Sequence, residues 1–226
     1  MESIHHIKAR IASIKNVGQI TKAMELVSAT KMRHAQEIAL RSRPYAFGAL
    51  ELLEVLSRHG KETVFSEARE VLHTLVVTIE SDKGLTGSFN TQVERKTEQF
   101  LQGDAHQQMV GHEYLFMPIG AKAHRFVERK GYTTAATFAG TGDYITLDAC
   151  ENIVAMILDG FEKRKWDRVV VVSMHFRTTL FQEALVREVL PLSREHIVES
   201  IANIIPEHGR FSSLPNDMPA VIHDDE

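Results

Sequence analysis

The chain has 226 residues, of which 43% are hydrophobic and 25% charged, and its formal net charge at pH 7 is −4. This composition is that of an ordinary folded protein and excludes a disordered chain. No apolar run is long enough to cross a bilayer, and the single cysteine, Cys150, excludes an internal disulfide. Met1-Glu2-Ser3 leads directly into a helical pattern without a signal or transit segment, which predicts a protein kept in a bacterial-type cytoplasm.

The first predicted element is one long helix from Ile4 to about Ile38. Its apolar residues recur at spacings of three and four, which is typical of a coiled coil with one three-residue stammer. They are Ile4, Ile7, Ile11, Ile14, Val17, Ile20, Met24 and Val27. Because so long a stripe is not buried by a small neighbouring domain, we expect a second long helix to cover it.

The same helix is basic. Residues 1–43 hold eight lysines and arginines against three glutamates, a net charge of +5, so the rest of the chain carries −9. Such asymmetry favours an acidic partner, although a solvated helix face also explains the lysines. The solvated face does not explain the isoleucine stripe.

Proline 44 is expected to kink or interrupt this helix, because proline disfavours helical geometry at the preceding residue. A second apolar helical piece then runs to about His59-Gly60. We therefore expect residues 1–60 to form an N-terminal shaft.

Alternating strands and helices follow and predict a Rossmann-like α/β domain over residues 71–192, with a mostly parallel sheet and an antiparallel last strand. The expected strands are Leu72–Ile79, His112–Ile119, a short one at Thr134–Phe138, Arg168–His175 and Thr179–Val189, the last with Leu180, Ala184 and Val186 on one face. Three helices are expected. The first begins near Asn90 and ends near Leu101, the second spans Ala121–Lys130, and the third spans about Leu147–Lys163. The last of these has Ile153, Met156, Ile157 and Phe161 as its inner face and contains Cys150, which we expect to be a small core residue.

Residues 193–226 form an irregular tail. One short helical stretch, HIVESIANII, precedes a segment rich in Pro, Ser and Asp that is expected to be unstructured.

A glycine-containing loop, Ser81 to Asn90, lies between a strand and a helix, where doubly wound folds bind phosphates. It has neither dinucleotide-binding nor P-loop spacing, so a tight turn or a protein contact is the better interpretation. Asp82 and Asp143 are the acidic residues at this edge of the sheet, and carboxylates there usually cap or form turns. The twelve histidines show no metal-binding spacing, and no catalytic triad motif is present, so we expect no metal, no cofactor and no catalytic residue.

Four separated segments resemble the γ subunit of F-type ATP synthases. They are QITKAMELVSATKMRHAQ at 19–36, Ser42-Arg43-Pro44-Tyr45, SDKGLTGSFN at 81–90, and the run from Val169 through Gln182-Glu183 to Leu190-Pro191-Leu192. The loop differs from the family's usual form, which has arginine in place of Lys83 and cysteine in place of Thr86.

The resemblance implies a noncatalytic central-stalk rotor subunit at the cytoplasmic face of the bacterial cell membrane. Such a subunit is expected to couple proton flow through the membrane sector to ATP synthesis at the β subunits. The implied partners are the α and β subunits, the ε subunit and the c-ring, through which membrane contact is indirect, and no nucleic acid.

The resemblance also implies contact residues. The shaft residues expected to contact the α/β ring are Lys8, Ile20, Lys22, Met24, Glu25 and Lys31. Asp82, Lys83 and Gly84 are expected in the loop that contacts β, with Lys83 pairing with an acidic β loop. Lysine keeps the charge of arginine but not its bidentate fork.

One feature of the family has no counterpart in this sequence. The family's shaft has a second, C-terminal helix, whereas this sequence ends at Asp224-Asp225-Glu226 without one. We expect a truncated γ chain. The alternatives are that the missing helix is a separate polypeptide or that the N-terminal helix pairs with a copy of itself.

Two other classes of function remain open from the sequence. A small-molecule-binding α/β enzyme would use the 81–90 loop and bind its ligand saturably. A basic coiled-coil protein that interacts with nucleic acid would lose affinity steeply as salt rises.

Overall fold

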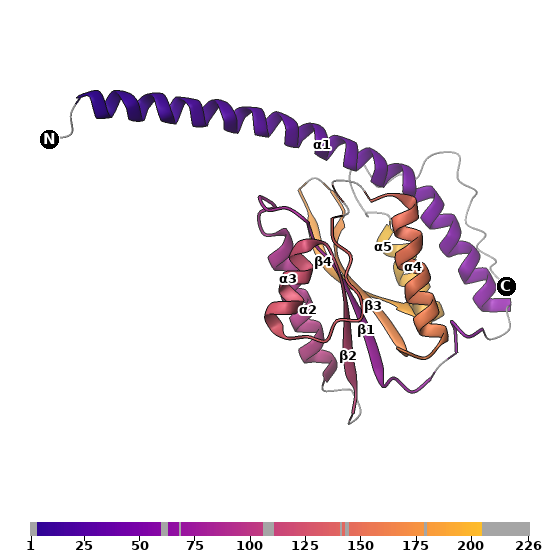
Figure 1. The fold of residues 1–226 in the computed structure, drawn as a ribbon. Coiled ribbons are helices and arrows are strands. Elements are labelled where there is room, and N and C mark those ends of the chain that lie inside the picture. Colours follow the sequence, from indigo (N-terminus) through magenta and orange to yellow (C-terminus); the bar gives the residue numbers. More distant parts are fainter. Residues whose placement is uncertain are drawn as a thin grey trace. The chain divides into compact units, whose positions relative to one another are not determined.

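The computed structural model describes residues 4–59, 63–67, 69–105, 111–140, 142, 145–178 and 180–204. The chain divides into two compact units, residues 1–46 and residues 47–226. The described part of the first unit is helical, and the second unit contains the sheet (Figure 1).

Helix α1 (Ile4–His59) is continuous and contains Pro44. The predicted long helix is confirmed, but an interruption at Pro44 is wrong. Proline removes one backbone donor, and the turns on either side keep their own hydrogen bonds, so the helix continues through it. Phe47, only 4% exposed, is the first large apolar residue of α1 to be buried, and it opens the second unit.

The second unit is built on a four-stranded sheet in the order β2-β1-β3-β4. Strand β1 (His73–Ile79) pairs in parallel with both β2 (Glu113–Ile119) and β3 (Arg168–Phe176), and β4 (Gln182–Leu190) returns antiparallel to β3. The predicted α/β class, parallel sheet and antiparallel last strand are confirmed. The runs of β-branched residues fit strands covered on both faces.

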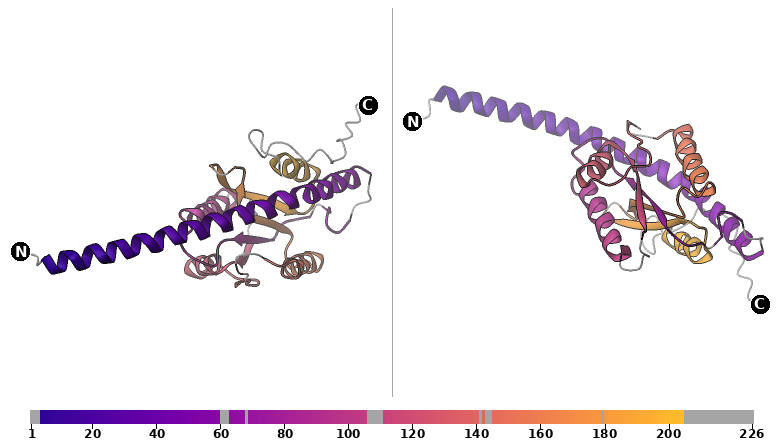
Figure 2. Two further views of the ribbon diagram at one scale, coloured as in Figure 1. Left: turned by 90° about the horizontal axis from the view of Figure 1, so that it is seen from above. Right: turned by 60° about the horizontal axis from the view of Figure 1, so that its bottom comes forward.

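Helices cover both faces of this sheet (Figures 1 and 2). Helices α2 (Phe89–Ala105) and α3 (Ala121–Lys130) enclose one core with Val76, Phe116 and Val170. Helix α4 (Leu147–Glu162) encloses the other with Leu75, Met117 and Val169. Helix α5 (Arg194–Ile204) contacts β4 and confirms the predicted helical stretch after Ser193.

Three details of the prediction are wrong. Residues 134–138 form no strand but two isolated parallel bridges, Phe116 with Thr134 and Ile119 with Phe138. Leu180 precedes β4 and is 98% exposed, because the turn before β4 extends to Phe181. Met156 is 42% exposed, since α4 buries Ile153 and Phe161 along a narrower stripe. Residues 205–226, predicted to be an unstructured tail, lie outside the described part of the chain.

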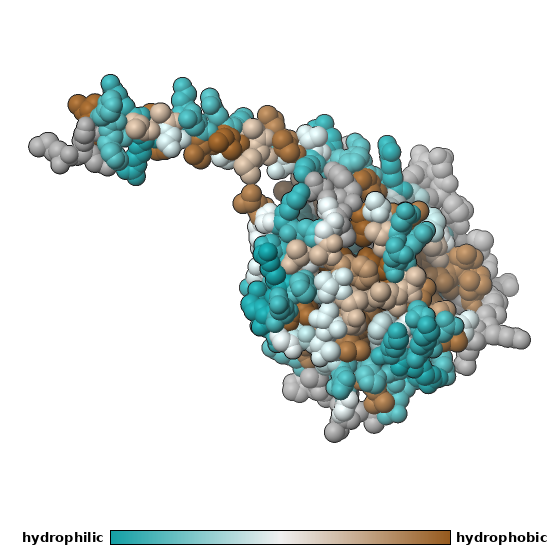
Figure 3. All heavy atoms as spheres, viewed as in Figure 1, coloured by the Kyte–Doolittle hydropathy of each residue, from teal (hydrophilic) through white to brown (hydrophobic). Residues whose placement is uncertain are grey.

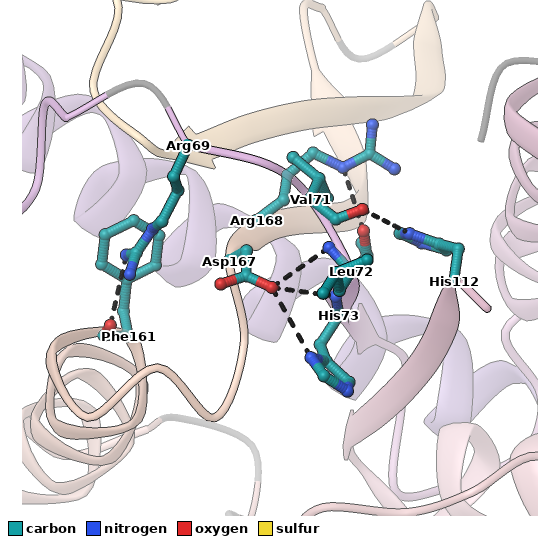
Figure 4. A network of polar contacts seen from close by, with 9 residues as sticks. Arg69, Val71, Leu72, His73, His112, Phe161, Asp167 and Arg168 are labelled. Carbon is teal, nitrogen blue, oxygen red and sulfur yellow. Dashed lines mark hydrogen bonds and ion pairs between the residues drawn. The ribbon is translucent and has the colours of Figure 1, made fainter. Parts of the chain in front are cut away.

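A polar network fixes the N-terminal edge of the sheet (Figure 4). The backbone N–H groups of Leu72 and His73 donate to Oδ2 of Asp167 at 3.1 and 3.0 Å. Arg168 donates from Nε to the Thr74 hydroxyl at 3.1 Å and forms an ion pair with Asp104 of α2. This network ties the starts of β1 and β3 together and leaves the opposite, C-terminal edge to carry the 81–90 loop.

Candidate subunit-contact site

The first candidate contact surface is the exposed part of α1. All eight residues of its apolar stripe, from Ile4 to Val27, are between 45% and 75% exposed. Figure 3 shows hydrophobic and hydrophilic residues side by side along this helix. Isolated exposed apolar side chains are ordinary, but a run of this length is typical of a protein interface.

The stripe does not stay on one side of the helix. At about 100° per residue, the set from Ile4 to Ile14 and the set from Val17 to Val27 are offset by about 140°. The three-residue step between Ile14 and Val17 produces most of this offset. A partner helix must therefore wind around α1, or the two sets must face different neighbours.

The predicted shaft residues fall on different sides of α1, and all are exposed. Ile20 and Met24 belong to the apolar stripe, and Lys31 lies nearly in line with them at about 20° from Ile20. Lys22 lies about 160° from Met24, on the opposite side. The helix thus presents an apolar side and a basic side at the same level.

The second candidate surface is the loop between β1 and α2, which contains Lys83 and Gly84. Asn90 fills its interior: the side-chain amide donates to the hydroxyls of Ser81 at 2.9 Å and Thr86 at 3.1 Å, and its oxygen accepts from the Ser81 backbone N–H at 3.1 Å. Asn90 thus occupies the interior space that a phosphate held by this loop would need.

Asp82 faces into the protein. Its Oδ1 accepts hydrogen bonds from the backbone N–H of Ala121 at 2.9 Å and of Gly140 at 3.1 Å, and Oδ2 accepts from Gly142 at 3.3 Å. The carboxylate therefore caps the start of α3 and joins two loops, which confirms the prediction of a turn-forming carboxylate. Asp143, the other acidic residue predicted at this edge, lies outside the described residues.

The tip of the loop points outward. Lys83 and Gly84 are exposed, and Leu85 is 91% exposed at a backbone φ of 64°. A non-glycine residue in this left-handed region costs about 1–2 kcal/mol. A Cβ added to Gly84 would meet nothing within 4 Å. Glycine at 84 is therefore not required by the packing of this chain.

Two residues that shape the loop were not predicted from the sequence. Gly120, at φ 101°, packs so closely that a Cβ would lie 2.2 Å from the Glu80 carbonyl oxygen, so only glycine fits there. Glu80 is only 6% exposed at the end of β1. The sequence feature that could have pointed to Glu80 is its position at the end of the apolar run LHTLVVTIE, since glutamate is seldom buried without a partner.

A separate hollow of about 720 Å³ lies beside α4. Its lining is mostly apolar and includes Leu115, Ala135, Met156 and Trp166, and no residue of the 81–90 loop contributes to it. Among the described residues no group of three or more histidine, cysteine, aspartate or glutamate side chains is arranged to hold a metal. The free cysteine, Cys150, is half-buried in α4.

Comparison with known proteins agrees with this architecture. The ATP synthase family model matches residues 3–222. The ATP synthase gamma chain of Salinibacter ruber is 31% identical over 219 residues, covering 93% of this chain and 71% of that relative. The gamma chain of Synechococcus sp. strain CC9311 is 32% identical over 236 residues, covering 99% of this chain and 74% of that relative.

The fold also matches a chain in the cryo-EM structure of the central stalk and c-ring of the Tetrahymena thermophila mitochondrial ATP synthase. The TM-score is 0.59 at 21% identity, with 84% of this chain and 79% of that chain covered. This likeness shows that the two chains share one fold. The chain belongs to the γ-subunit family of ATP synthases, which confirms the predicted family and central-stalk role.

Proposed function

We propose that this chain acts as a noncatalytic rotor that couples proton flow through a membrane sector to ATP synthesis at the β subunits. The observation that carries this proposal is the continuous helix α1 with its long exposed apolar stripe, in a chain of the γ family. A rotor transmits torque through a stiff element that is asymmetric around its axis. The offset between the two halves of the stripe supplies such asymmetry.

The proposed division of labour keeps residues 1–60 as the shaft and residues 71–192 as the foot. On the shaft, the proposed contacts with the ring of α and β subunits are Lys8, Ile20, Lys22, Met24, Glu25 and Lys31. Because Met24 and Lys22 lie on opposite sides of α1, they are proposed to meet different parts of the ring. The basic side favours attraction to the acidic β loop that it faces at each rotational angle.

The foot is proposed to contact β through the tip of the 81–90 loop. Lys83 supplies the charge for an acidic β loop, and the unoccupied space around Gly84 admits close approach of a partner backbone. Strained backbone tends to occur at functional sites, and Leu85 is such a strained residue next to the proposed contact. Asp82, also a proposed contact with β, supports this tip through its hydrogen bonds to Ala121 and Gly140.

The ε subunit and the c-ring are the proposed partners of the foot, at the cytoplasmic face of a bacterial cell membrane. None of the described helices combines the length and apolarity needed to cross a bilayer. Contact with the membrane is proposed to be indirect, through the c-ring.

Charge reversal at the loop tests the contact with β. Lys83→Glu should weaken binding of the full chain to an αβ preparation from the same source about 5- to 10-fold at low salt, because a favourable charge pair becomes repulsive. Lys83→Arg should bind at least as well as the unaltered chain, since arginine adds a bidentate fork. The matched control is Arg95→Glu, an equal reversal at an exposed site on α2.

Gly84→Ala gives an independent check. It should leave the stability of the chain unchanged, because no neighbouring atom lies within 4 Å of the added methyl group, and yet weaken the binding. If Lys83→Glu and Arg95→Glu bind alike, the proposed loop contact is wrong.

A further inference from the structure

A buried carboxyl group lies at the root of the proposed contact loop. Glu80 follows directly after β1, and its backbone N–H donates to the Ile119 carbonyl at 2.9 Å. Among the described residues, neither oxygen of its side chain has a hydrogen-bond partner. The buried hydroxyl of Thr78, two residues earlier on the same face of the strand, also lacks one. A buried carboxyl without donors strongly disfavours its charged form.

The charges around Glu80 come from the two helices that cover this face. Glu94 of α2 repels a charge on Glu80, and Arg129 of α3 attracts it. Arg129, however, is engaged by Glu94, with Nη2 2.8 Å from Oε2. Burial, followed by the repulsion from Glu94, raises the pKa of Glu80 to about 7.

The sign of the resulting pH effect follows from this shift. In the unfolded chain Glu80 has its ordinary pKa of 4.5, so between pH 4.5 and about 7 the folded chain binds more protons than the unfolded one. Stability therefore falls as the pH rises through this window and stays lower above it. Ionised Glu80 needs a cation, and Arg129 is the cation that acts on it from α3.

The backbone of Glu80 lies next to the contacts that anchor the loop to α3. Gly120 packs against the Glu80 carbonyl. The residue after Glu80 is Ser81, whose carbonyl oxygen accepts a hydrogen bond from the Lys122 backbone N–H at 3.0 Å and whose own N–H donates to Asn90. Asp82 then bonds to Ala121 at the start of α3. A change at Glu80 would therefore act on the hydrogen bonds that join Ser81 and Asp82 to the start of α3.

We propose that Glu80 is a proton-operated switch for the 81–90 loop. Neutral Glu80 keeps the loop in the geometry described above. Ionised Glu80 draws Arg129 from Glu94, separates α2 from α3, and loosens the loop. The inference rests on the proposed function only in that this loop is the contact with β, so the switch would make that contact sensitive to the cytoplasmic pH.

Amide hydrogen exchange of the full chain at pH 6 and pH 8, corrected for the intrinsic effect of pH, tests the switch. Exchange within residues 81–90 should be about 10-fold faster at pH 8 in the unaltered chain. Glu80→Gln, which keeps the side chain neutral, should abolish the difference. The matched control, Glu128→Gln at an exposed site on α3, should behave as the unaltered chain.

Two further variants cover the case that Glu80→Gln does not fold. Glu94→Gln removes a repulsion and should move the midpoint of the exchange transition to lower pH, whereas Arg129→Gln should move it to higher pH. The proposal would be overturned if the midpoints of Glu94→Gln and Arg129→Gln moved in the same direction. It would also be overturned if Glu80→Gln showed the same pH dependence as the unaltered chain. A failure of the proposed β contact can be told apart from a failure of the switch. If only the β contact is wrong, Lys83→Glu binds the αβ preparation normally at both pH values, and the hydrogen-exchange results are unchanged.

Discussion

At the scale of single residues, the loop is held by atoms that face inward, and its tip faces outward. Asp82, Asn90 and Gly120 bond or pack inside the protein. Lys83, Gly84 and Leu85 are exposed. Within the loop, therefore, Asp82 and Asn90 are held by contacts inside the protein, whereas Lys83, Gly84 and Leu85 are exposed to a partner.

Substitution of Asp82 separates these roles. Asp82→Ala removes the acceptor of three backbone N–H groups and should lower the free energy of unfolding by about 1–3 kcal/mol. Asp82→Asn keeps one carboxamide oxygen that can accept from Ala121 and Gly140, so its free energy of unfolding should fall by less than that of Asp82→Ala. Urea unfolding of the three chains measures the difference, and an alanine variant as stable as the original would show that the cap contributes nothing.

At the scale of elements, α1 and the sheet should differ sharply in local stability. Residues 4–27 bury none of their apolar stripe, and isolated helices have marginal stability in water, whereas β1 and β3 form the centre of the sheet. In the full chain alone, the amides of residues 4–27 should exchange at least 100-fold faster than those of β1. If the amides of residues 4–27 were as well protected as those of β1 at two protein concentrations, this description would be wrong. Protection of residues 4–27 that grows with protein concentration would indicate pairing of two copies.

The sequence predicts the elements well where local patterning decides the outcome. The bounds of α3 agree with the prediction at both ends, and the β3 run RVVVVSMH is one residue short. Tertiary context decides the rest. Residues 134–138 have strand-like composition but make only two bridges, and Met156 fits the helical period but falls outside the buried stripe.

The candidate site was predictable in part for the same reason. The 81–90 segment and the turn-forming role of Asp82 followed from turn chemistry and strand position. The partners of Asp82 come from 39 to 60 residues away, so they were not visible in local sequence. The burial of Glu80 depends on α2 and α3 closing over β1, which no short motif encodes.

At the scale of the whole molecule, we propose that this chain is the rotor of an ATP synthase. Co-purification of the chain with α and β subunits from the same source, followed by an ATPase assay, tests it most directly. We expect a stoichiometric complex with one copy of this chain and ATPase activity that depends on its presence. A chain that elutes alone or as a homodimer in the presence of folded α and β subunits would contradict the claim.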